Sequence, residues 1–482
     1  MKLKIFAALA LLAGGLFFYC DQRATTEIVV LSTNDVHASI GGSPRLATFV
    51  KEMRAENENV LVMDGGDFCS GNPYVDMAEH RGEPIIDLMN IVGYDVITLG
   101  NHEFDYNVTN LKRNLDRLNA DVLCANADFS RSVLRNSVKP YKIVEVGGVR
   151  MAILGLIELT DLGVPSTLPA NVSSIKFRDG IEVSQEYRFL RDSADLVVGL
   201  THLGYQTDSL MVCVNDMFDL IVGGHSHTHI TEGRTINGTV VTQSGSRLDN
   251  VGVTRIKVKR GKVKSIVNET VSLAGYEPDS VAAAYVERVT SDSPLNQPIG
   301  KLDVALDKTG LKNLITDAVR KRSRADIALQ NSGSIRIDKL EAGDVTSANI
   351  YSLDPFGNHI VTQRLTLAQI KELLMTNYKR PHAKSTDLSP SGMTYRVIMG
   401  ADGVVTDIEC FDMDGKPMVD GKLYRMATNN YVSSAYIYEG QNKASKLGLA
   451  PVKIAEVVID AFKATDVYNG DNTERAVIVR AE

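Results

Sequence analysis

The chain contains no tryptophan, few other aromatic residues and no excess of basic side chains. Only 6% of its 482 residues are aromatic, so any aromatic platform for a ligand must come from Phe, Tyr or His. The formal net charge is -7. Because proteins that bind nucleic-acid polymers usually carry a basic footprint, a polymeric nucleic-acid partner is disfavoured. A small phosphorylated ligand is compatible with this charge, since bound metal ions can supply positive charge locally.

Long apolar runs are also missing, except at the start of the chain. Lys2 and Lys4 precede an apolar stretch at 5–19, and Cys20 follows it directly. The stretch is too short to span a bilayer comfortably and is typical of an export signal. Its end resembles a bacterial lipoprotein cleavage site, although Phe18-Tyr19 stands where such sites have small residues. We favour an exported chain that is lipid-anchored through Cys20, with membrane contact only through that anchor; the alternative is a plain secretory signal.

Cysteine is scarce. Besides Cys20 the chain has Cys69, Cys124, Cys213 and Cys410, and none of them stands in a CxxC pair of the kind that binds structural zinc. Export permits disulfides, but the spacing of these residues specifies no pairing. Disulfide pairing therefore stays open, and we favour buried free thiols.

Short apolar runs alternate with helical segments in the first half of the chain. The runs are continuous and rich in β-branched residues, which is typical of strands covered on both faces. They lie at 28–31, 60–63, 96–99, 122–124, 151–156, 196–200 and 220–222. Helical segments such as 44–56 and 83–91 separate several of them. This alternation predicts a layered α/β fold.

The pattern changes after residue 238. Antiparallel strands are predicted at 240–243, 251–258 and 263–267, with Arg260-Gly261 as a hairpin turn. A helix is predicted at 278–289, and 293–300 breaks the pattern and is the candidate linker. A second, α+β region begins near residue 302, with a helix at 311–324 and a strand at 327–329.

Polar side chains follow directly after five of the predicted strands. The segments are NDVH (34–37), DGGDF (64–68), GNHEFD (100–105), THLG (201–204) and GGHSHTH (223–229), and they hold six of the nine histidines. A single histidine is more often packed or solvated than a metal ligand. Five such segments indicate one shared site, because ligands gather at the carboxyl ends of parallel strands.

The order of these segments is similar to that of the calcineurin-like metallophosphoesterases, and a second domain narrows the resemblance to the 5′-nucleotidase and UDP-sugar hydrolase family. The resemblance covers nearly the whole chain after the signal segment. It implies an N-terminal four-layer α/β domain, a β-sandwich flanked by helices, and a smaller α+β C-terminal domain that binds substrate. We expect a signal segment at 1–20, the metallophosphoesterase domain at 26–275, a linker helix and hinge at 276–300, and the C-terminal domain at 301–482.

Carboxylate, imidazole and amide ligands suit borderline divalent ions such as zinc, manganese, iron or cobalt. The resemblance implies two such ions that share Asp67 as a bridging ligand. It assigns Asp35, His37 and His227 to one ion, and Asn101, His202 and His225 to the other. His227 is the least secure of these assignments, because relatives carry Gln, Asn or His there. His229 is expected to lie outside the ligand set.

The resemblance also assigns a catalytic pair. His102 is expected to donate a proton to a phosphoryl oxygen in the transition state, and Asp105 is expected to orient it. Asp105 follows His102 by three positions, so one helical turn would place both side chains on the same side. The alternative, in which Asp105 is only a helix cap, leaves His102 unexplained.

Two motifs of the C-terminal half resemble substrate-binding motifs of the family. The stretch QNSGSIR contains Asn331, Gly333 and Arg336, and LDPFGN contains Phe356. In the family these residues grip the substrate: an arginine binds anionic groups, and an aromatic pair, completed here by Tyr431, sandwiches the base. The alternative for each aromatic residue is ordinary packing.

One motif of the family is missing. A GGDG-like stretch, whose acidic residue binds the ribose hydroxyls, is replaced by Ser-Ser-Ala-Tyr-Ile at 433–437. The expected activity is hydrolysis of 5′-nucleotides to nucleosides and phosphate at the cell envelope. The alternatives are the same chemistry on cyclic nucleotides, nucleotide sugars or another small phosphoester, and a non-catalytic surface binding protein. The intact ligand set argues against the last, and the sequence specifies neither native metals nor oligomeric state.

Overall fold

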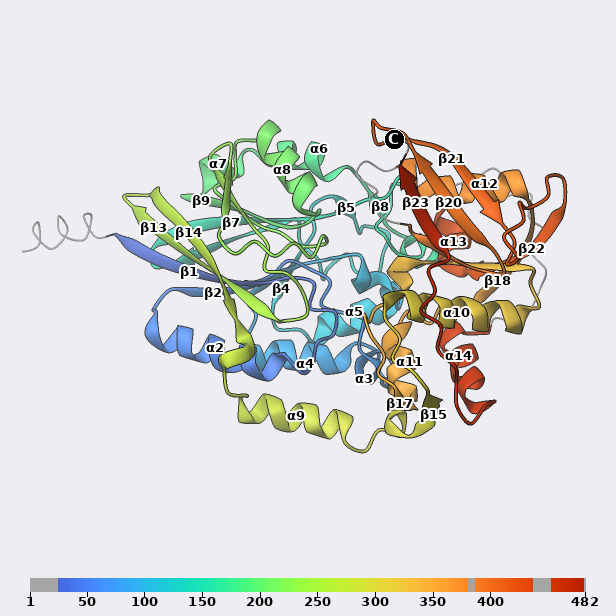
Figure 1. Ribbon diagram of the computed structural model, residues 1–482. Coiled ribbons are helices and arrows are strands. Elements are labelled where there is room, and N and C mark those ends of the chain that lie inside the picture. The colour runs from blue at the N-terminus through green and yellow to red at the C-terminus, as the bar shows by residue number, and fades with distance from the viewer. Residues whose placement is uncertain (1–24, 380–385, 437–451, 481–482) are drawn as a thin grey trace, which may run out of the picture. The chain divides into compact units, whose positions relative to one another are not determined.

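The computed structural model describes residues 25–379, 386–436 and 452–480. They form two compact units (Figure 1). Unit 1 holds the chain up to Ser70 and His80–Arg288, and unit 2 holds Gly71–Glu79 and the chain from Val289 onward. The predicted signal segment, including Cys20, lies outside the described residues. Within the described ranges, no helix combines the length and the apolar character that a membrane crossing requires.

Unit 1 is built on two six-stranded sheets. The first has the order β14-β13-β1-β2-β3-β4, and the second has the order β11-β12-β10-β9-β7-β6. The first comprises β1 (Thr26–Thr33), β2 (Val60–Asp64), β3 (Val96–Thr98), β4 (Asp121–Leu123), β13 (Asn250–Lys259) and β14 (Lys262–Ser272). The second comprises β6 (Tyr141–Val146), β7 (Val149–Ile157), β9 (Leu196–His202), β10 (Leu220–Val222), β11 (Arg234–Ile236) and β12 (Thr239–Thr242). Strands β1 to β4 are mutually parallel, which brings their carboxyl ends to one edge.

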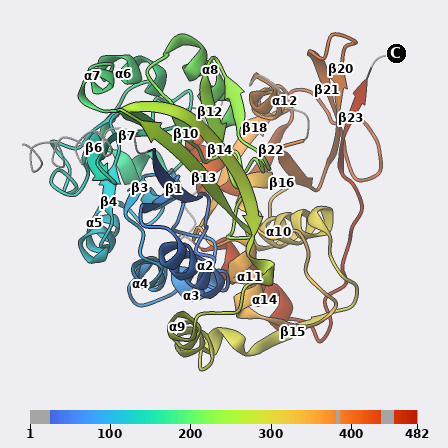
Figure 2. The same cartoon turned by 90° about the vertical axis from the view of Figure 1, so that its left-hand side faces the viewer.

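The two sheets pack face to face, and helices cover their outer faces. Ile28 and Met63 of the first sheet meet Ile153 and Val198 of the second in one aliphatic core. Helices α2 (Ser43–Glu56), α4 (Glu83–Val92) and α5 (Val108–Arg117) lie beside the first sheet, and α6 (Gly180–Glu186), α7 (Leu190–Ser193) and α8 (Tyr205–Val214) lie beside the second (Figures 1 and 2). This arrangement confirms the four-layer α/β fold and explains the continuous apolar runs, because the central strands are buried on both faces.

One predicted pairing in unit 1 is partly wrong. Strand β12 pairs antiparallel with β11 but parallel with β10. A short apolar run indicates that a strand is buried but carries no information on its direction. The run at 240–243 therefore could not distinguish parallel from antiparallel pairing. The predicted β13–β14 hairpin is present, and Arg260 and Gly261 take φ of 53° and 65°, as its tight turn requires.

Unit 2 contains a four-stranded sheet of order β18-β22-β16-β19, a three-stranded sheet of order β21-β20-β23 and a two-stranded sheet of β15 and β17. The strands are β15 (Pro298–Leu302), β16 (Ile327–Asn331), β17 (Gly343–Thr346), β18 (Ile360–Thr366), β19 (Leu388–Ser391), β20 (Thr394–Met399), β21 (Val405–Phe411), β22 (Leu423–Asn429) and β23 (Ala476–Arg480). Helices α10 (Lys308–Ser323), α11 (Ser347–Leu353) and α14 (Ile454–Lys463) share one core with the four-stranded sheet, and α12 (Leu367–Met375) shares another.

Two local expectations differ from the structure. The predicted linker at 293–300 is not irregular throughout, because Pro298 begins strand β15, which pairs with β17. Proline at the first residue of an edge strand sacrifices no ladder hydrogen bond, so it does not end the strand. Cys213 is exposed, whereas Cys69, Cys124 and Cys410 are buried as expected, and these four described cysteines form no disulfide.

Candidate metal centre

The side chains predicted to bind metal lie at the last residue of β9, which is His202, and in the loops that follow β1, β2, β3 and β10. Five of these residues have backbone φ in the left-handed region: Asp35 (51°), His37 (46°), Asp67 (60°), His225 (76°) and His227 (52°). A non-glycine residue with positive φ is uncommon, and holding one costs roughly 1–3 kcal/mol. Backbone strain at five residues along one edge of the sheets indicates that these side chains are held in place for function, at a cost in local stability.

The strained loops gather their side chains into three overlapping groups. Within each group, one potential ligand atom from every residue lies within 4.8 Å of the others. The groups are Asp35, His37 and His227; His37, Asp67 and His102; and Asp67, His202 and His225. Asp67 belongs to two groups, so a bridging carboxylate between two ions is compatible with this geometry.

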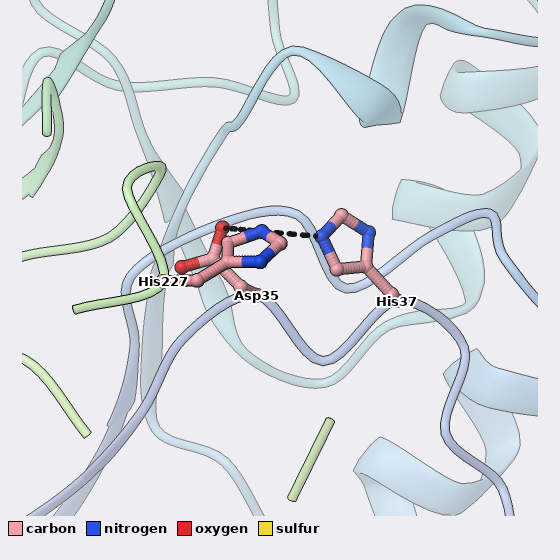
Figure 3. A group of neighbouring side chains, drawn as sticks. All are labelled: Asp35, His37 and His227. Atoms are coloured by element: carbon pink, nitrogen blue, oxygen red, sulfur yellow. Dashed lines mark hydrogen bonds and ion pairs between the residues drawn. The ribbon is translucent and has the colours of Figure 1, made fainter. Parts of the chain in front are cut away.

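The first group matches the ligands predicted for one ion (Figure 3). The Nε2 atoms of His37 and His227 lie 3.0 Å apart, and His227 Nε2 lies 3.4 Å from Asp35 Oδ1. Asp35 is fully buried, and its carboxylate also accepts hydrogen bonds from Asn34 Nδ2 at 2.6 Å and from the backbone N–H of His225. Two imidazole nitrogens and a carboxylate oxygen that converge on one point are a donor set suited to a divalent cation.

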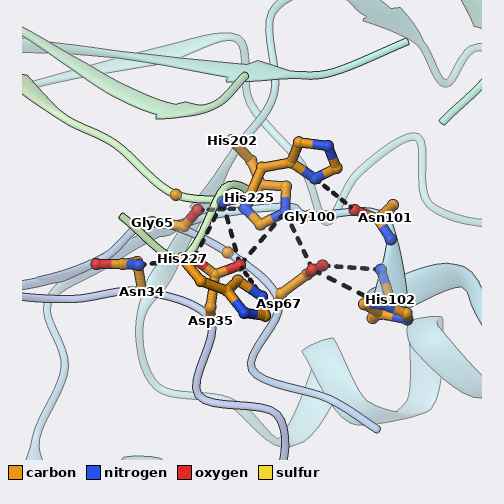
Figure 4. A network of polar contacts seen from close by, with 12 residues as sticks. Asn34, Asp35, Gly65, Asp67, Gly100, Asn101, His102, His202, His225 and His227 are labelled. Atoms are coloured by element: carbon orange, nitrogen blue, oxygen red, sulfur yellow. Dashed lines mark hydrogen bonds and ion pairs between the residues drawn. The ribbon is translucent and has the colours of Figure 1, made fainter. Parts of the chain in front are cut away.

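The second group surrounds Asp67 and His202 (Figure 4). His202 Nε2 lies 3.1 Å from Asp67 Oδ2, and Asn101 Oδ1 lies 3.1 Å from His225 Nδ1. The structure thus brings the four side chains predicted for the other ion to one place. Asn101 also donates from Nδ2 to the backbone carbonyl of Ser166, which leaves its oxygen facing His225.

His202 gives a test of whether a cation fits this place. Its Nδ1 lies 2.7 Å from the carbonyl oxygen of Gly65, which can only accept, so Nδ1 carries a proton. Its buried Nε2 lies 3.1 Å from Asp67 Oδ2 without forming a well-aligned hydrogen bond to any described residue. Such an orphaned imidazole nitrogen beside a carboxylate fits a metal ligand, and the carbonyl that orients the ring is the usual partner of metal-binding histidines.

The pKa values of His202 and Asp67 also indicate a site for a cation. Burial lowers the pKa of His202, but the carboxylates of Asp67 and Asp35 outweigh it and raise that pKa to about 10. Burial also opposes ionisation of Asp67, yet His202, His102 and His37 together hold its pKa well below the ordinary value. The site therefore keeps negative charge at its centre, which favours binding of a cation there.

His102 and Asp105 form the predicted pair. His102 begins the single turn η1 (His102–Phe104), and its Nδ1 lies 2.7 Å from Asp105 Oδ2. Ser70 Oγ and Thr167 Oγ1 donate to the same carboxylate at 2.6 and 3.3 Å. The other ring nitrogen, Nε2, lies 3.9 Å from Asp67 Oδ2. Asp105 also closes the turn with its backbone N–H, so the cap role coexists with the orienting role.

Sequence reasoning missed Glu103, which organises the site without belonging to it. Its carboxylate is buried and accepts from the backbone N–H groups of Asp67, Cys69 and Gly100 at 2.9, 3.0 and 2.6 Å. Burial and the neighbouring Asp67 carboxylate raise the pKa of Glu103 to about 7. Glu103 thereby ties the loop after β2 to the loop after β3. The sequence signal that could have identified Glu103 is its position as an acidic residue inside the GNHEFD segment.

Gly100 offers a direct test of how tightly the loops are packed. A methyl group at this position would meet Asp67 Oδ1 at 2.2 Å and the Asp67 backbone nitrogen at 2.5 Å. We expect Gly100→Ala to displace Asp67 and to lower metal affinity by roughly 10- to 100-fold, measured by competition with a chelating dye. Gly41→Ala is the control, because a methyl group there meets nothing within 4 Å. Equal metal affinity in the two variants would contradict the packing argument.

The predicted substrate residues lie in unit 2. Asn331 ends β16 and accepts a hydrogen bond from Asn429 Nδ2 at 2.8 Å, and exposed Gly333 lies in the turn that follows. The guanidinium of Arg336 lies 5.7 Å from the ring centroid of Phe356, a cation–π contact. Tyr431 lies in α13 (Asn430–Ala435), with its ring centroid 6.2 Å from that of Tyr436. An arginine and an aromatic face thus lie together, while Tyr431 packs partly against the core.

Asp354, two residues before Phe356, makes the stability of unit 2 depend on pH in a predictable direction. It is buried, one carboxylate oxygen accepts from Asn358 Nδ2 at 3.2 Å, and the other has no hydrogen-bond partner among the described residues. Burial raises its pKa from 3.8 to about 7. Between these two values the unfolded chain releases this proton while the folded chain keeps it, so stability falls as pH rises through that window and stays low above it.

We therefore expect Asp354→Asn, which mimics the protonated acid, to unfold like the wild type near pH 4 and to be more stable above pH 7. The gain is at most about 4 kcal/mol, and urea titrations at both pH values measure it. The same change at exposed Asp344 is the matched control. A constant difference between Asp354→Asn and wild type at all pH values would contradict a buried, titrating carboxyl.

Helix-flanked paired sheets with a cluster of His and Asp ligands at the strand ends define a metal-dependent phosphoesterase fold. Residues 28–229 match the family model of calcineurin-like phosphoesterases. Residues 290–436 match that of the 5′-nucleotidase C-terminal domain. The chain thus carries a calcineurin-like phosphoesterase domain followed by a 5′-nucleotidase C-terminal domain, the combination that the motif order predicted.

Known relatives agree with this assignment. Protein UshA of Yersinia enterocolitica is 26% identical over 484 residues, which cover 85% of this chain and 86% of that protein. The trifunctional nucleotide phosphoesterase YfkN of Bacillus subtilis is 26% identical over 474 residues; these cover 85% of this chain but 32% of that longer protein. The crystal structure of a 5′-nucleotidase precursor from Thermus thermophilus superposes with a TM-score of 0.82 at 25% identity, over 94% of this chain and 99% of that one.

Proposed function

We propose that the chain is an exported enzyme that uses two divalent ions to hydrolyse 5′-nucleotides to nucleosides and phosphate. The observation that carries the proposal is the placement of Asp67. Its carboxylate lies in two ligand groups at once, beside His202 in one and near His37 and His102 in the other. The names of the relatives, nucleotide phosphoesterase and 5′-nucleotidase, support this substrate class.

The donor sets fit two cations. Asp35, His37 and His227 would hold one, Asn101, His202 and His225 would hold the other, and Asp67 would be shared. When bound, such ions lower the pKa of a water nucleophile and neutralise charge that grows on the phosphoryl oxygens. Zinc, manganese, iron and cobalt all suit these ligands, and the native pair is a matter for metal analysis.

The side chains of the chain itself supply a proton and its orientation. Asp105 can only accept at its 2.7 Å contact, so His102 holds a proton on Nδ1. The Asp105 carboxylate, itself fixed by Ser70 and Thr167, stabilises the doubly protonated ring. Asp105 bonds to Nδ1, so the opposite ring nitrogen, protonated Nε2, would donate to a phosphoryl oxygen of the substrate.

Unit 2 offers groups for the remainder of a nucleotide. The Arg336 guanidinium suits an anionic group, and the Phe356 ring gives a base a stacking face. No acidic side chain occupies the stretch where the family has GGDG. Ser433 and Ser434 there are engaged by Gln363 and by the Asn430 carbonyl. This departure favours, as the second candidate, cyclic nucleotides, nucleotide sugars or another small phosphoester.

A substrate panel tests the proposal. Chelated protein is supplied with zinc, manganese or cobalt. Phosphate release is followed from 5′-nucleotides and p-nitrophenyl phosphate. The products of 2′,3′-cyclic nucleotides and UDP-glucose are separated by chromatography, because opening the ring or cleaving the pyrophosphate yields phosphate monoesters and no free phosphate. We expect 5′-nucleotides to give the highest kcat/KM and chelator to abolish turnover. A preference for cyclic nucleotides or UDP-glucose would select the second candidate. Stable metal binding without hydrolysis of any compound would make the chain a binding protein.

Export, the anchor and the domain limits belong to the same proposal. A lipid on Cys20 is tested by labelled palmitate, which should enter the wild type and not Cys20→Ser. The proposed domains are 26–275 and 301–482 with a linker at 276–300. The compact units divide between Arg288 and Val289, which supports a boundary inside that linker.

A further inference from the structure

The β13–β14 hairpin carries an unusual concentration of positive charge for an acidic chain. Its sequence from residue 257 to 264 is Lys-Val-Lys-Arg-Gly-Lys-Val-Lys, with five basic residues in eight. The net charge of the whole chain is -7. We refer to Lys257, Lys259, Arg260, Lys262 and Lys264 as the basic tip.

The geometry of the hairpin places these charges together on its surface. Lys257 and Lys259 alternate with Ile256 and Val258, which are buried in the core between the sheets, so both lysines stand on the opposite, outer face. Lys259 is registered directly opposite Lys262 across the hairpin. Like charges at directly opposed positions destabilise a sheet, so this pairing costs stability unless an anion lies against it.

Few acidic groups neutralise the basic tip. Lys257 lies 3.7 Å from Glu27, which also pairs with Arg255. Asp195 lies beside Gly261 in the turn and accepts from the backbone N–H of Arg150. Among the described residues, the other four members of the tip form no ion pair within 4.0 Å, and Arg260, Lys262 and Lys264 are exposed.

The chain enters the fold beside this tip. Thr26, the first residue of β1, pairs with Val258 in the antiparallel β1–β13 ladder. The start of β1 and the hairpin turn therefore share one end of unit 1, at the left of Figure 1 and toward the viewer in Figure 2. Only five residues separate Cys20 from Thr26. Fully extended, that connection spans at most about 20 Å.

We propose that the basic tip is a membrane-contact surface for anionic phospholipid headgroups and acts together with the anchor at Cys20. The inference rests on the proposed export and lipid attachment. A lipid on Cys20 would hold this end of unit 1 at the membrane surface, because the start of β1 lies beside the hairpin. Each basic residue near an anionic bilayer adds to the attraction, so the tip would strengthen that contact and orient the domain.

Vesicle sedimentation tests the proposal on the chain from residue 21 onward, so that neither lipid nor the apolar segment contributes. We expect binding to vesicles of phosphatidylglycerol and phosphatidylcholine, weaker binding as NaCl is raised, and no binding to phosphatidylcholine alone. Lys259→Glu/Arg260→Glu/Lys262→Glu should weaken binding by roughly 100-fold. Phosphate release from a soluble substrate should be unchanged, because the tip carries no predicted site residue.

The control is Arg131→Glu/Arg135→Glu/Lys176→Glu, which changes the charge of unit 1 equally at exposed positions outside the hairpin. Equal binding by the two triple variants would overturn the proposal. So would absence of binding by the wild type, which would leave the lysines only to protect the edge strand β14 from pairing. Displacement of the vesicles by a DNA oligonucleotide at equal charge would also overturn it and reassign the tip to polyanions in general. None of these outcomes depends on whether the enzyme acts on nucleotides.

Discussion

His102→Ala is expected to lower kcat for 5′-nucleotides by roughly 100- to 10,000-fold while leaving the bound metal unchanged. The reason is that His102 is bonded through Nδ1 to Asp105, while its Nε2 lies 3.9 Å from Asp67 Oδ2. It is close enough to act on a phosphoryl group held at the same place. Its removal takes away a proton donor and leaves every predicted ligand present.

The geometry is also compatible with a different role for His102, that of a metal ligand. His102 shares one of the three ligand groups with His37 and Asp67, so it could bind an ion itself. Metal analysis of the variant, run beside its steady-state kinetics, separates the two roles. Loss of metal together with activity would make His102 a ligand. His229→Ala is the matched control, since His229 is exposed and outside all three groups, and it should retain both metal and rate.

Asp105→Asn refines the same test. An amide at this position can still accept from His102 Nδ1, but it no longer stabilises a positively charged ring. We expect a smaller loss of kcat than in His102→Ala, and a lower pKa for the acidic group in the kcat–pH profile. An unchanged profile would restrict Asp105 to closing the turn η1.

The sequence was sufficient for the layered fold because both faces of its central strands are buried. Runs such as 28–31 and 196–200 are uninterrupted apolar stretches for that reason, and the spacing between runs indicated that helices alternate with the strands. It could not settle the direction of β12, because an apolar run has no polarity. The predicted linker at 293–300 was also wrong in taking Pro298 as a break, because an edge strand can begin with proline.

In the candidate site, too, some residues could be predicted from the sequence and others could not. Side chains that could touch an ion were found, because His, Asp and Asn at strand ends are rare enough to stand out. The residues that hold those side chains were not. Glu103 and Asn34 act through backbone groups far apart in sequence, namely the Asp67 and Ser244 N–H, and such contacts leave no local pattern. The positive φ of Asp35 and His37 is likewise invisible until the loops are folded.

Asp67→Asn is expected to have the larger effect on the metals: loss of at least one of two ions, and a fall in kcat/KM of at least about 10,000-fold. Among the described residues, Asp67 belongs both to the ligand group of His202 and to a ligand group of His37, and no amide can bridge two cations as a carboxylate does. Asparagine tolerates the left-handed backbone that Asp67 adopts at φ 60°, so the loop itself should persist.

The control for that experiment lies three residues earlier. Asp64 is buried, accepts from Thr33 Oγ1 and the Gly66 N–H, and belongs to none of the ligand groups. Burial raises the pKa of Asp64 well above the usual range, so replacing it with uncharged asparagine is expected to cost little at this position. Asp64→Asn should therefore keep both ions and nearly full activity. If Asp67→Asn also retained two ions, as measured by mass spectrometry of the native protein, no shared carboxylate would join them and the proposed two-metal site would fail.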